Sequence, residues 1–193
     1  MPPMSHRFPL CRVLALACTL AGCSSGVVSH SSASQGTPAQ LDQSNLTLAP
    51  LQFVSFCVRN GSECAPRGPS DALLPWTPEL SATLVAVNLS VNARIAPSRE
   101  ENLWRINPTS GNCNDYVVSK RHELLARGLP SSALLISVVR TRAGEGHLVL
   151  VVRTDRGEMV LDNLTSQIRD AAETSYSWIK RQTTRDPKLW EKA

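Results

Sequence analysis

The 193-residue sequence lacks several features that would indicate a function directly. Its formal net charge is only +4 and is spread along the chain, which argues against a nucleic-acid-binding protein. It has no internal repeat, and its apolar run from Val13 to Ala21 is too short to span a bilayer. It contains only four histidines, so each candidate general base can be considered in turn.

The first 22 residues have the form of an export signal. Arg7 and Arg12 precede the apolar run and supply the positive charge of such a signal. The run leads into the sequence LAGC, residues 20–23, which resembles the lipobox of bacterial lipoproteins. The resemblance implies cleavage before Cys23, acylation of Cys23 and, because Ser24 follows, a periplasmic protein anchored in the outer membrane. Loss of the two arginines would reduce the net charge from +4 to about +2. The alternative is an ordinary cleaved signal peptide.

Two segments of different composition follow the expected cleavage point. Residues 23–46 are rich in Ser, Ala, Gly and Gln without periodicity, which predicts a flexible tether. His30 lies in this segment and is therefore not expected to act in catalysis. Residues 47–193 have the length of one domain with a single core.

Three cysteines remain after the lipobox. Cys57 and Cys64 flank a turn-rich loop, residues 59–62. Because disulfides persist outside the cytoplasm, we expect these two to pair, the alternative being two free thiols near the surface. Cys113 is then left over, and an odd cysteine in an exported protein requires an explanation.

The middle of the sequence predicts two helices. Thr77 suits an N-cap and Pro78 the first turn, so a helix begins there and carries Asn88 and Asn92 on a shared face. A second helix is expected over residues 112–127, where a glycine follows as its natural end. We expect its apolar residues to lie on one side, with three charged residues facing outward: Lys120, Arg121 and Glu123.

The remaining segments predict a sheet. Residues 51–64 read as a strand or extended segment that ends in the disulfide loop. Beyond Pro130 the apolar period becomes two, and residues 147–153 are apolar on both faces, which is typical of a central strand. The expected strands of this part are 133–140, 147–153, 158–164 and 176–182.

Cys113 stands at the start of the second predicted helix. A thiol there lies among backbone N–H groups without intrahelical acceptors, at the positive end of the helix dipole. Both effects favour the thiolate, which is the nucleophilic form. Cys113 is therefore a candidate nucleophile.

Only one histidine can reach Cys113. His6 belongs to the export signal and His30 to the tether. His122 follows nine residues later on the same helix, about 900° around it and ~13 Å along its axis, so it lies on the opposite face. His147, at the start of the central strand, remains.

Asp162 is the candidate third residue. A two-residue turn at positions 155–156 would place Thr154 opposite Gly157, and Asp162 would then lie diagonally across from His147 on the same face. A loop with an odd number of residues would turn Asp162 away. Cysteine, histidine and aspartate in this order on helix, strand and strand suit thiol acyl transfer.

These residues resemble those of the bacterial transglutaminase-like cysteine peptidases, the group that includes the LapG-type periplasmic proteases. The resemblance covers residues 51–190, and its specific parts are GNCNDY at 111–116, Gly146-His147 and VLDN at 160–163. The other matching positions are Asn88, Asn92, Trp104, Lys120, Gly128, Tyr176-Ser177-Trp178 and residues 186–190.

The resemblance implies an α+β fold of the papain-like, transglutaminase-like type, with the nucleophile helix packed on an antiparallel β-sheet. It implies Cys113 as nucleophile, His147 as general base and later acid, and Asp162 as the residue that orients His147. Asn92 is a candidate oxyanion donor beside the backbone N–H of Cys113. The expected protein is a monomeric thiol peptidase of the cell envelope that needs no cofactor and cleaves a protein substrate.

One departure from the family pattern concerns a metal. The resemblance implies acids on both sides of the cysteine that contribute to calcium binding in the LapG-type enzymes. Here those positions are Asn112 and Asn114, and only Asp115 remains. Because calcium sites depend on carboxylate charge, we expect no metal site here.

Two other functions stay open from the sequence. An amine instead of water could resolve the acyl-enzyme, which would give a cross-linking or amide-exchange enzyme. A catalytically degenerate family member could act as a binding module in the envelope. Acyl-acceptor competition would test the first alternative, and reactivity of the Cys113 thiol would test the second.

Overall fold

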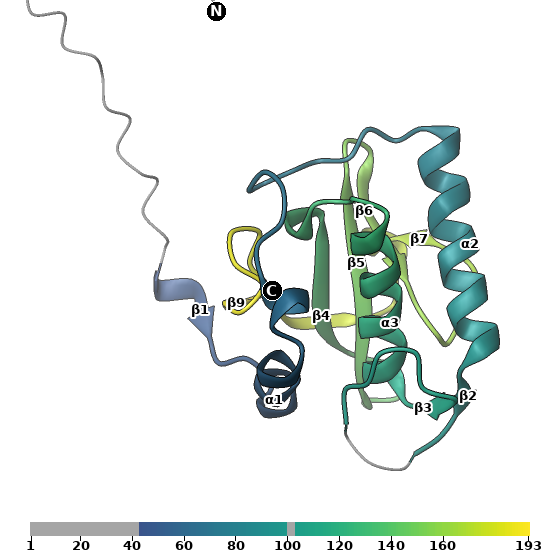
Figure 1. Ribbon diagram of the computed structural model, residues 1–193, viewed down its shortest axis with the longest axis horizontal. Coiled ribbons are helices and arrows are strands. Elements are labelled where there is room, and N and C mark those ends of the chain that lie inside the picture. The colour runs from purple at the N-terminus through teal and green to yellow at the C-terminus, as the bar shows by residue number, and fades with distance from the viewer. Residues whose placement is uncertain (1–42, 100–102) are drawn as a thin grey trace, which may run out of the picture. The chain divides into compact units, whose positions relative to one another are not determined.

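The computed structural model describes residues 43–99 and 103–193 (Figure 1). The predicted export signal, the predicted lipidation site Cys23 and residues 23–42 of the predicted tether lie outside the described residues. Leu46, which the sequence assigned to the tether, already belongs to the fold, since it pairs with Glu191. Within the described ranges, no helix is both long and apolar enough to cross a membrane.

A seven-stranded sheet forms the centre of the fold, with antiparallel pairing throughout. Its strand order is β1-β9-β8-β4-β5-β6-β7. A separate parallel pair joins β2 (Ala96–Pro97) and β3 (Ser110–Gly111). The strands of the large sheet are β1 (Leu46–Thr47), β4 (Leu134–Arg140), β5 (Gly146–Thr154), β6 (Gly157–Leu161), β7 (Arg169–Asp170), β8 (Ser177–Gln182) and β9 (Trp190–Lys192).

The hairpin from β5 to β6 has the predicted register. Thr154 pairs with Gly157 and Leu150 pairs with Leu161, as a two-residue turn requires. β6 ends at Leu161, three residues before the predicted end of this strand. The reason is local: Asp162 Oδ1 accepts a hydrogen bond from Leu164 N at 3.0 Å, which turns the chain away from β5.

Both faces of the central strands are buried, which explains their unbroken apolar sequence. One face joins the helices in the main core, and the other packs under the segment around Tyr176 and Trp178. On the helix side lie Leu134, Ile136, Leu150 and Val152, and on the opposite side lie Leu135, Val139, Val149 and Val151.

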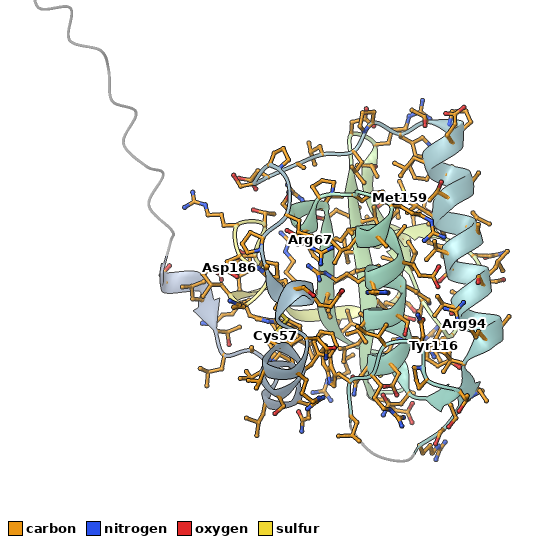
Figure 2. The ribbon with its side chains drawn as sticks, viewed as in Figure 1. Cys57, Arg67, Arg94, Tyr116, Met159 and Asp186 are labelled. Carbon is orange, nitrogen blue, oxygen red and sulfur yellow. A yellow bond between two sulfur atoms is a disulfide. The ribbon has the colours of Figure 1, made fainter. Side chains whose placement is uncertain are left out.

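Two helices build a layer on the sheet (Figure 1). α3 (Cys113–Ala126) packs on β4 and β5, and α2 (Pro78–Arg94) packs against α3. α2 begins as predicted, with Thr77 Oγ1 accepting a hydrogen bond from Leu80 N at 3.2 Å. Tyr116, labelled in Figure 2, donates its hydroxyl to the carbonyl oxygen of Ile95 just beyond α2, which ties the two helices together.

The predicted extended segment at 51–64 is wrong, because its first part is the helix α1 (Leu51–Arg59). Phe53 and Phe56 are three residues apart, so a helix brings both into the core, where Phe53 contacts Trp104 and Trp190. Alternation along a strand would have separated the two phenylalanines onto opposite faces.

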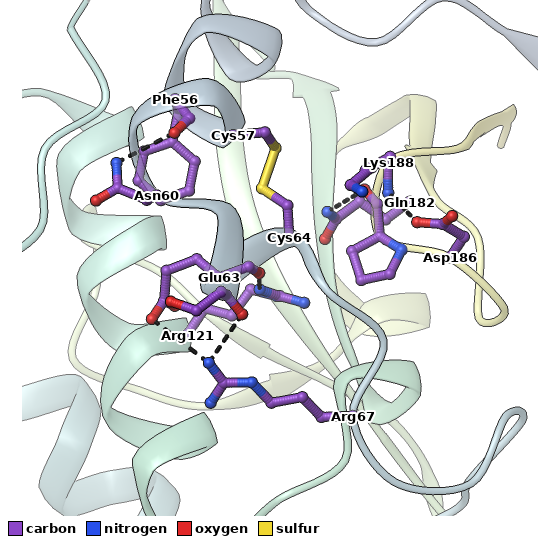
Figure 3. Close-up of a disulfide and its surroundings, with 12 residues drawn as sticks. Phe56, Cys57, Asn60, Glu63, Cys64, Arg67, Arg121, Gln182, Asp186 and Lys188 are labelled. Atoms are coloured by element: carbon purple, nitrogen blue, oxygen red, sulfur yellow. Dashed lines mark hydrogen bonds and ion pairs between the residues drawn. A yellow bond between two sulfur atoms is a disulfide. The ribbon is translucent and has the colours of Figure 1, made fainter.

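The loop after α1 is held by the predicted disulfide between Cys57 and Cys64 (Figure 3). Its second cysteine ends the short 3-10 helix η2 (Gly61–Cys64). Glu63, in the same turn, binds α3 through His122 Nδ1 at 2.8 Å. The disulfide loop is therefore fixed to the C-terminal half of the nucleophile helix.

The expectation that Lys120 and Arg121 face solvent is wrong. α3 packs on β4 and β5 and has α2 beside it, and both side chains are buried. Arg121 donates from Nε to Leu134 O at 3.0 Å and from Nη1 to Glu63 O at 2.6 Å. It therefore connects α3, β4 and the disulfide loop, whereas Lys120 has no such bonds and is considered below.

Candidate active site

Cys113 is the first residue of α3, as predicted, and it is the free cysteine of the described residues. Asn112 caps the helix by accepting a hydrogen bond from Asn114 N at 3.1 Å. Asp115 completes the capping box by accepting from Asn112 N at 3.1 Å. Two polar neighbours in sequence thus fix the backbone that carries the thiol.

An ion pair between buried Asp115 and the partly exposed Arg105 supports this turn. Asp115 is fully buried. Its Oδ1 accepts a hydrogen bond from the backbone N of Arg105 at 2.7 Å, and its Oδ2 lies 3.3 Å from Arg105 Nη2. Gly111 makes room for it, since a Cβ at that position would lie 2.3 Å from Asp115 Oδ2. Asp115 therefore has a structural role at the start of α3.

His147 and Asp162 are brought together by the β5–β6 hairpin. His147 Nε2 lies 2.8 Å from Asp162 Oδ1, and both side chains are almost fully buried. Nε2 is bonded to the carboxylate, which leaves Nδ1 for another partner, and Cys113 lies near enough to contribute to the raised pKa of His147. The three residues selected from the sequence therefore meet at one place.

The charge state of His147 follows from its two partners. Burial by itself lowers the pKa of His147, but the hydrogen bonds and negative charges of Asp162 and Cys113 raise it to about 9. At neutral pH the ring is therefore an imidazolium.

Two further residues hold Asp162, and neither was predicted to do so. The hydroxyl of Tyr176 donates to Asp162 Oδ2, and the two rings of Tyr176 and His147 lie 5.8 Å apart. Burial and the Asp162 carboxylate together raise the pKa of Tyr176, so it remains a donor. Tyr176 matched the family pattern, but only its position in space reveals its contact.

Asn92 is the second of these residues, and its predicted oxyanion role gains no support. Its Nδ2 donates to Asp162 O at 2.9 Å and to Thr165 O at 3.5 Å. The amide hydrogens are thus engaged with the chain just after β6, because α2 packs beside that segment. Asn92 supports the backbone of Asp162 instead of facing the thiol.

A cleft of about 350 Å³ opens beside Cys113. Gln52 of α1 lines it, and its amide has no hydrogen-bond partner among the described residues. The sequence missed Gln52 because the segment around it was expected to be extended. The other residues around the cleft are Pro50, Trp104, Asn112, Asn114, Val138, Gly146, Leu148 and Lys180.

The residues around Cys113 do not fit a calcium ion. Both carboxylate oxygens of Asp115 are engaged with Arg105 and with the backbone N of Asn112. Asn112 Oδ1 accepts the capping hydrogen bond from Asn114 N. Calcium prefers several oxygen ligands with carboxylate charge, and the one carboxylate here is neutralised by a guanidinium.

The family follows from a direct comparison. The model of the bacterial transglutaminase-like cysteine proteinases matches residues 43–193. The chain belongs to this family. As a transglutaminase-like cysteine peptidase it has a protein as its substrate, and the α+β fold expected from the resemblance is confirmed.

Solved structures agree with this transglutaminase-like fold. Calcium-bound LapG of Legionella pneumophila is 20% identical over 72% of this chain and 77% of that chain, with a TM-score of 0.52. The EGTA-treated form of that LapG is 19% identical over 74% and 76% of the two chains, also with a TM-score of 0.52. At this identity the likeness concerns the fold. The comparison with curated proteins finds no match.

Proposed function

We propose that this cysteine peptidase cleaves peptide bonds through a Cys113–His147–Asp162 triad and a thioester intermediate. The observation that carries the proposal is the 2.8 Å bond between His147 Nε2 and Asp162 Oδ1, on a ring whose pKa the nearby Cys113 also raises. The imidazolium charge of that ring at neutral pH adds support. A thiolate paired with an imidazolium is the reactive form of such a site.

The chemical steps use these three groups and water. The Cys113 thiolate attacks the peptide carbonyl carbon, and the resulting tetrahedral intermediate collapses with cleavage of the C–N bond. His147 gives its proton to the leaving amine, which leaves a thioester on Cys113. Neutral His147 then takes a proton from water as its oxygen attacks the thioester, and collapse releases the acid and restores the thiolate–imidazolium pair.

The negative oxygen of the tetrahedral intermediate needs hydrogen-bond donors. The backbone N–H of Cys113 lies in the first turn of α3, where such groups have no intrahelical acceptor. The Gln52 amide lines the same cleft and is available as a second donor. Its proposed role replaces the one considered for Asn92.

Alkylation of Cys113 by iodoacetamide tests the triad without a known substrate. The rate is measured from pH 4 to 10 for the wild type and for His147→Ala, with Cys113 read by peptide mass spectrometry. We expect rapid alkylation of the wild type well below pH 8, slowed by the substitution. Alkylation that starts only near the ordinary thiol value of about 8.5, and that ignores His147, would overturn the proposal.

We further propose that the enzyme is a monomer anchored in the outer membrane, facing the periplasm, through acylated Cys23. Support comes from the LAGC sequence at Cys23 and the following serine. Metabolic labelling with radioactive palmitate should mark the wild type and not Cys23→Ser. Equal labelling of both, or a soluble wild type after cell fractionation, would contradict the anchor.

A further inference from the structure

Lys120 is a buried cation that the proposed chemistry does not use. Its side chain is 0% exposed, and its Nζ has no hydrogen-bond partner among the described residues. It follows Cys113 by seven residues on α3, about 700° around the axis, so it lies on the same side two turns deeper. Burial of an ammonium group is costly without a compensating charge, so an acid is expected near it.

Asp162 is the acid whose charge acts on Lys120. Burial lowers the pKa of Lys120 to about 7, and attraction to the Asp162 carboxylate opposes that decrease. On the same helix, the ring of Tyr116 has its centroid 5.9 Å from Nζ. Tyr116 stays neutral at physiological pH, because burial first and the charge of Asp115 second raise its pKa.

Among the described residues, Asp162 is the one charged group found to act on Lys120, although β5, which also packs on α3, carries the His147 ring that is paired with Asp162. β4 and β5 contribute apolar side chains to the core beneath it. α2 contributes Asn88 and Asn92, whose Nδ2 atoms bind the segment from Asp162 to Ser166. Beyond Asp162, Arg169 of β7 shares a small cavity with Asp162 and Tyr176, on an exposed edge of the fold.

The reactive form of the triad carries an uncompensated negative charge. The thiolate and the imidazolium cancel, which leaves the carboxylate of Asp162, a residue only 2% exposed. We propose that protonated Lys120 is a positioning residue that compensates the charge of Asp162 and thereby favours the thiolate–imidazolium form of the site. This inference rests on the triad proposed above.

The direction of the effect is fixed by electrostatics. A positive charge near Asp162 favours the ionised forms of the carboxylate and the thiolate, so its removal moves thiolate formation to higher pH. With a pKa of about 7, Lys120 is fully protonated in the acid range, where thiolate formation begins in such a pair. The effect of the Lys120 charge on thiolate formation is therefore fully present in the acid range.

The test compares the pH–rate profile of Cys113 alkylation by iodoacetamide in the full wild-type chain and in Lys120→Met. The quantity compared is the acid limb, the range of low pH over which the rate rises. Methionine keeps an unbranched apolar stem and removes the charge. We expect the acid limb to move up by ~0.5–1 pH unit. We expect the melting temperature to stay the same or rise, because replacing a buried charge by an apolar group removes its desolvation cost. A purely structural lysine would give a lower melting temperature and an unmoved limb.

Lys188→Met is the matched control, since it removes one positive charge from an exposed side chain. An acid limb of Lys120→Met that coincides with the wild type overturns the inference, and so does an equal shift in Lys188→Met. His147→Ala separates the two proposals. If His147→Ala reacts like the wild type, the triad fails; if only Lys120→Met is without effect, the triad stands and the positioning role fails.

A direct titration covers the case in which Lys120→Met does not fold. In wild-type protein labelled with ¹³C-lysine, the Lys120 Cε resonance should titrate near pH 7. The ring resonances of His147 should show an inflection at the same pH. Titration of Lys120 near 10.4, the ordinary value for lysine, or the absence of that inflection at His147, overturns the inference.

Discussion

Asp162 is the side chain on which the hydrogen bonds of the site converge. Its Oδ1 accepts from His147 Nε2 and from Leu164 N, and its Oδ2 accepts from the hydroxyl of Tyr176. Burial alone would raise the pKa of Asp162, but these bonds and the charge of His147 lower it. An ionised carboxylate in this position keeps the histidine ring charged and fixes its orientation.

Asp162→Asn should therefore slow alkylation of Cys113 at pH 6 by ~10-fold or more, because an amide cannot stabilise the imidazolium by charge. The measurement is the iodoacetamide rate on folded protein, with folding checked by circular dichroism. Asp155→Asn is the control, since Asp155 binds the backbone of Trp76 in a turn remote in sequence from the nucleophile. Equal rates for the wild type and Asp162→Asn would remove Asp162 from the site.

His147 should also make stability depend on pH. Its pKa is raised to about 9 in the fold from 6.5, so its stabilising effect is complete below pH 6.5 and is lost as pH rises through 9. Lys120, with its pKa lowered to about 7, acts in the opposite sense, since its burial cost is relieved as pH rises. The difference in the free energy of unfolding between wild type and His147→Gln isolates the histidine. That difference should shrink from pH 6.5 to 9.5 in urea titrations, and a constant difference would contradict the raised pKa.

At the scale of the element, the N-terminus of α3 is where structure and reactivity depend on each other. Asn112 and Asp115 satisfy the first backbone N–H groups of the helix and hold Cys113 between them. Asp115 is buried beneath that turn, and Gly111 leaves the space it occupies. A helix start built in this way needs a glycine before its cap.

Gly111→Ala should accordingly destabilise the protein by ~1–3 kcal/mol, the usual cost of adding a methyl group to a packed site. The new Cβ would meet the Asp115 side chain, whose Oδ2 and Cβ would lie 2.3 and 2.7 Å away. Gly61→Ala is the matched control, because nothing lies within 4 Å of its Cβ position. Urea unfolding measures both, and equal stability of the two variants would contradict the close approach at Gly111.

For the whole molecule, the sheet supplies a rigid base on which separate parts of the chain meet. α3 provides the nucleophile, the β5–β6 hairpin provides His147 and Asp162, and α1 provides one wall of the cleft. The disulfide loop and Arg121 fasten α1 to α3 (Figure 3). The site therefore depends on the assembled core and on no single segment.

Calcium should have no effect on the folded protein as a whole. The carboxylate of Asp115 is neutralised by Arg105, and the flanking positions are Asn112 and Asn114. We expect the melting temperature with 5 mM calcium and with EGTA to agree within ~1 °C, since a ligand that does not bind cannot stabilise. Magnesium is the control for ionic strength. A melting temperature that rises with calcium but not with magnesium would contradict this prediction. It would mean that carbonyl and amide oxygens are enough to bind calcium.

Local patterns in the sequence determined much of this protein. The cap at Thr77, the start of α3 at Cys113 and the two-residue turn after Thr154 each depend on residues close together in the chain. From the turn, the strand period placed His147 and Asp162 on one face, and their 2.8 Å bond agrees with that register. Such features are predictable because each rests on short-range geometry.

Contacts between distant residues decided the rest. Segment 51–59 became a helix because the core requires Phe53 and Phe56 on one side. Arg121 is buried, and it donates a hydrogen bond to Glu63 O, 58 residues earlier. The Asn92 amide donates to Asp162 O, 70 residues later, and so is not available as an oxyanion donor. No periodicity encodes these pairings, since each forms only when the packed sheet and helices bring separate segments together.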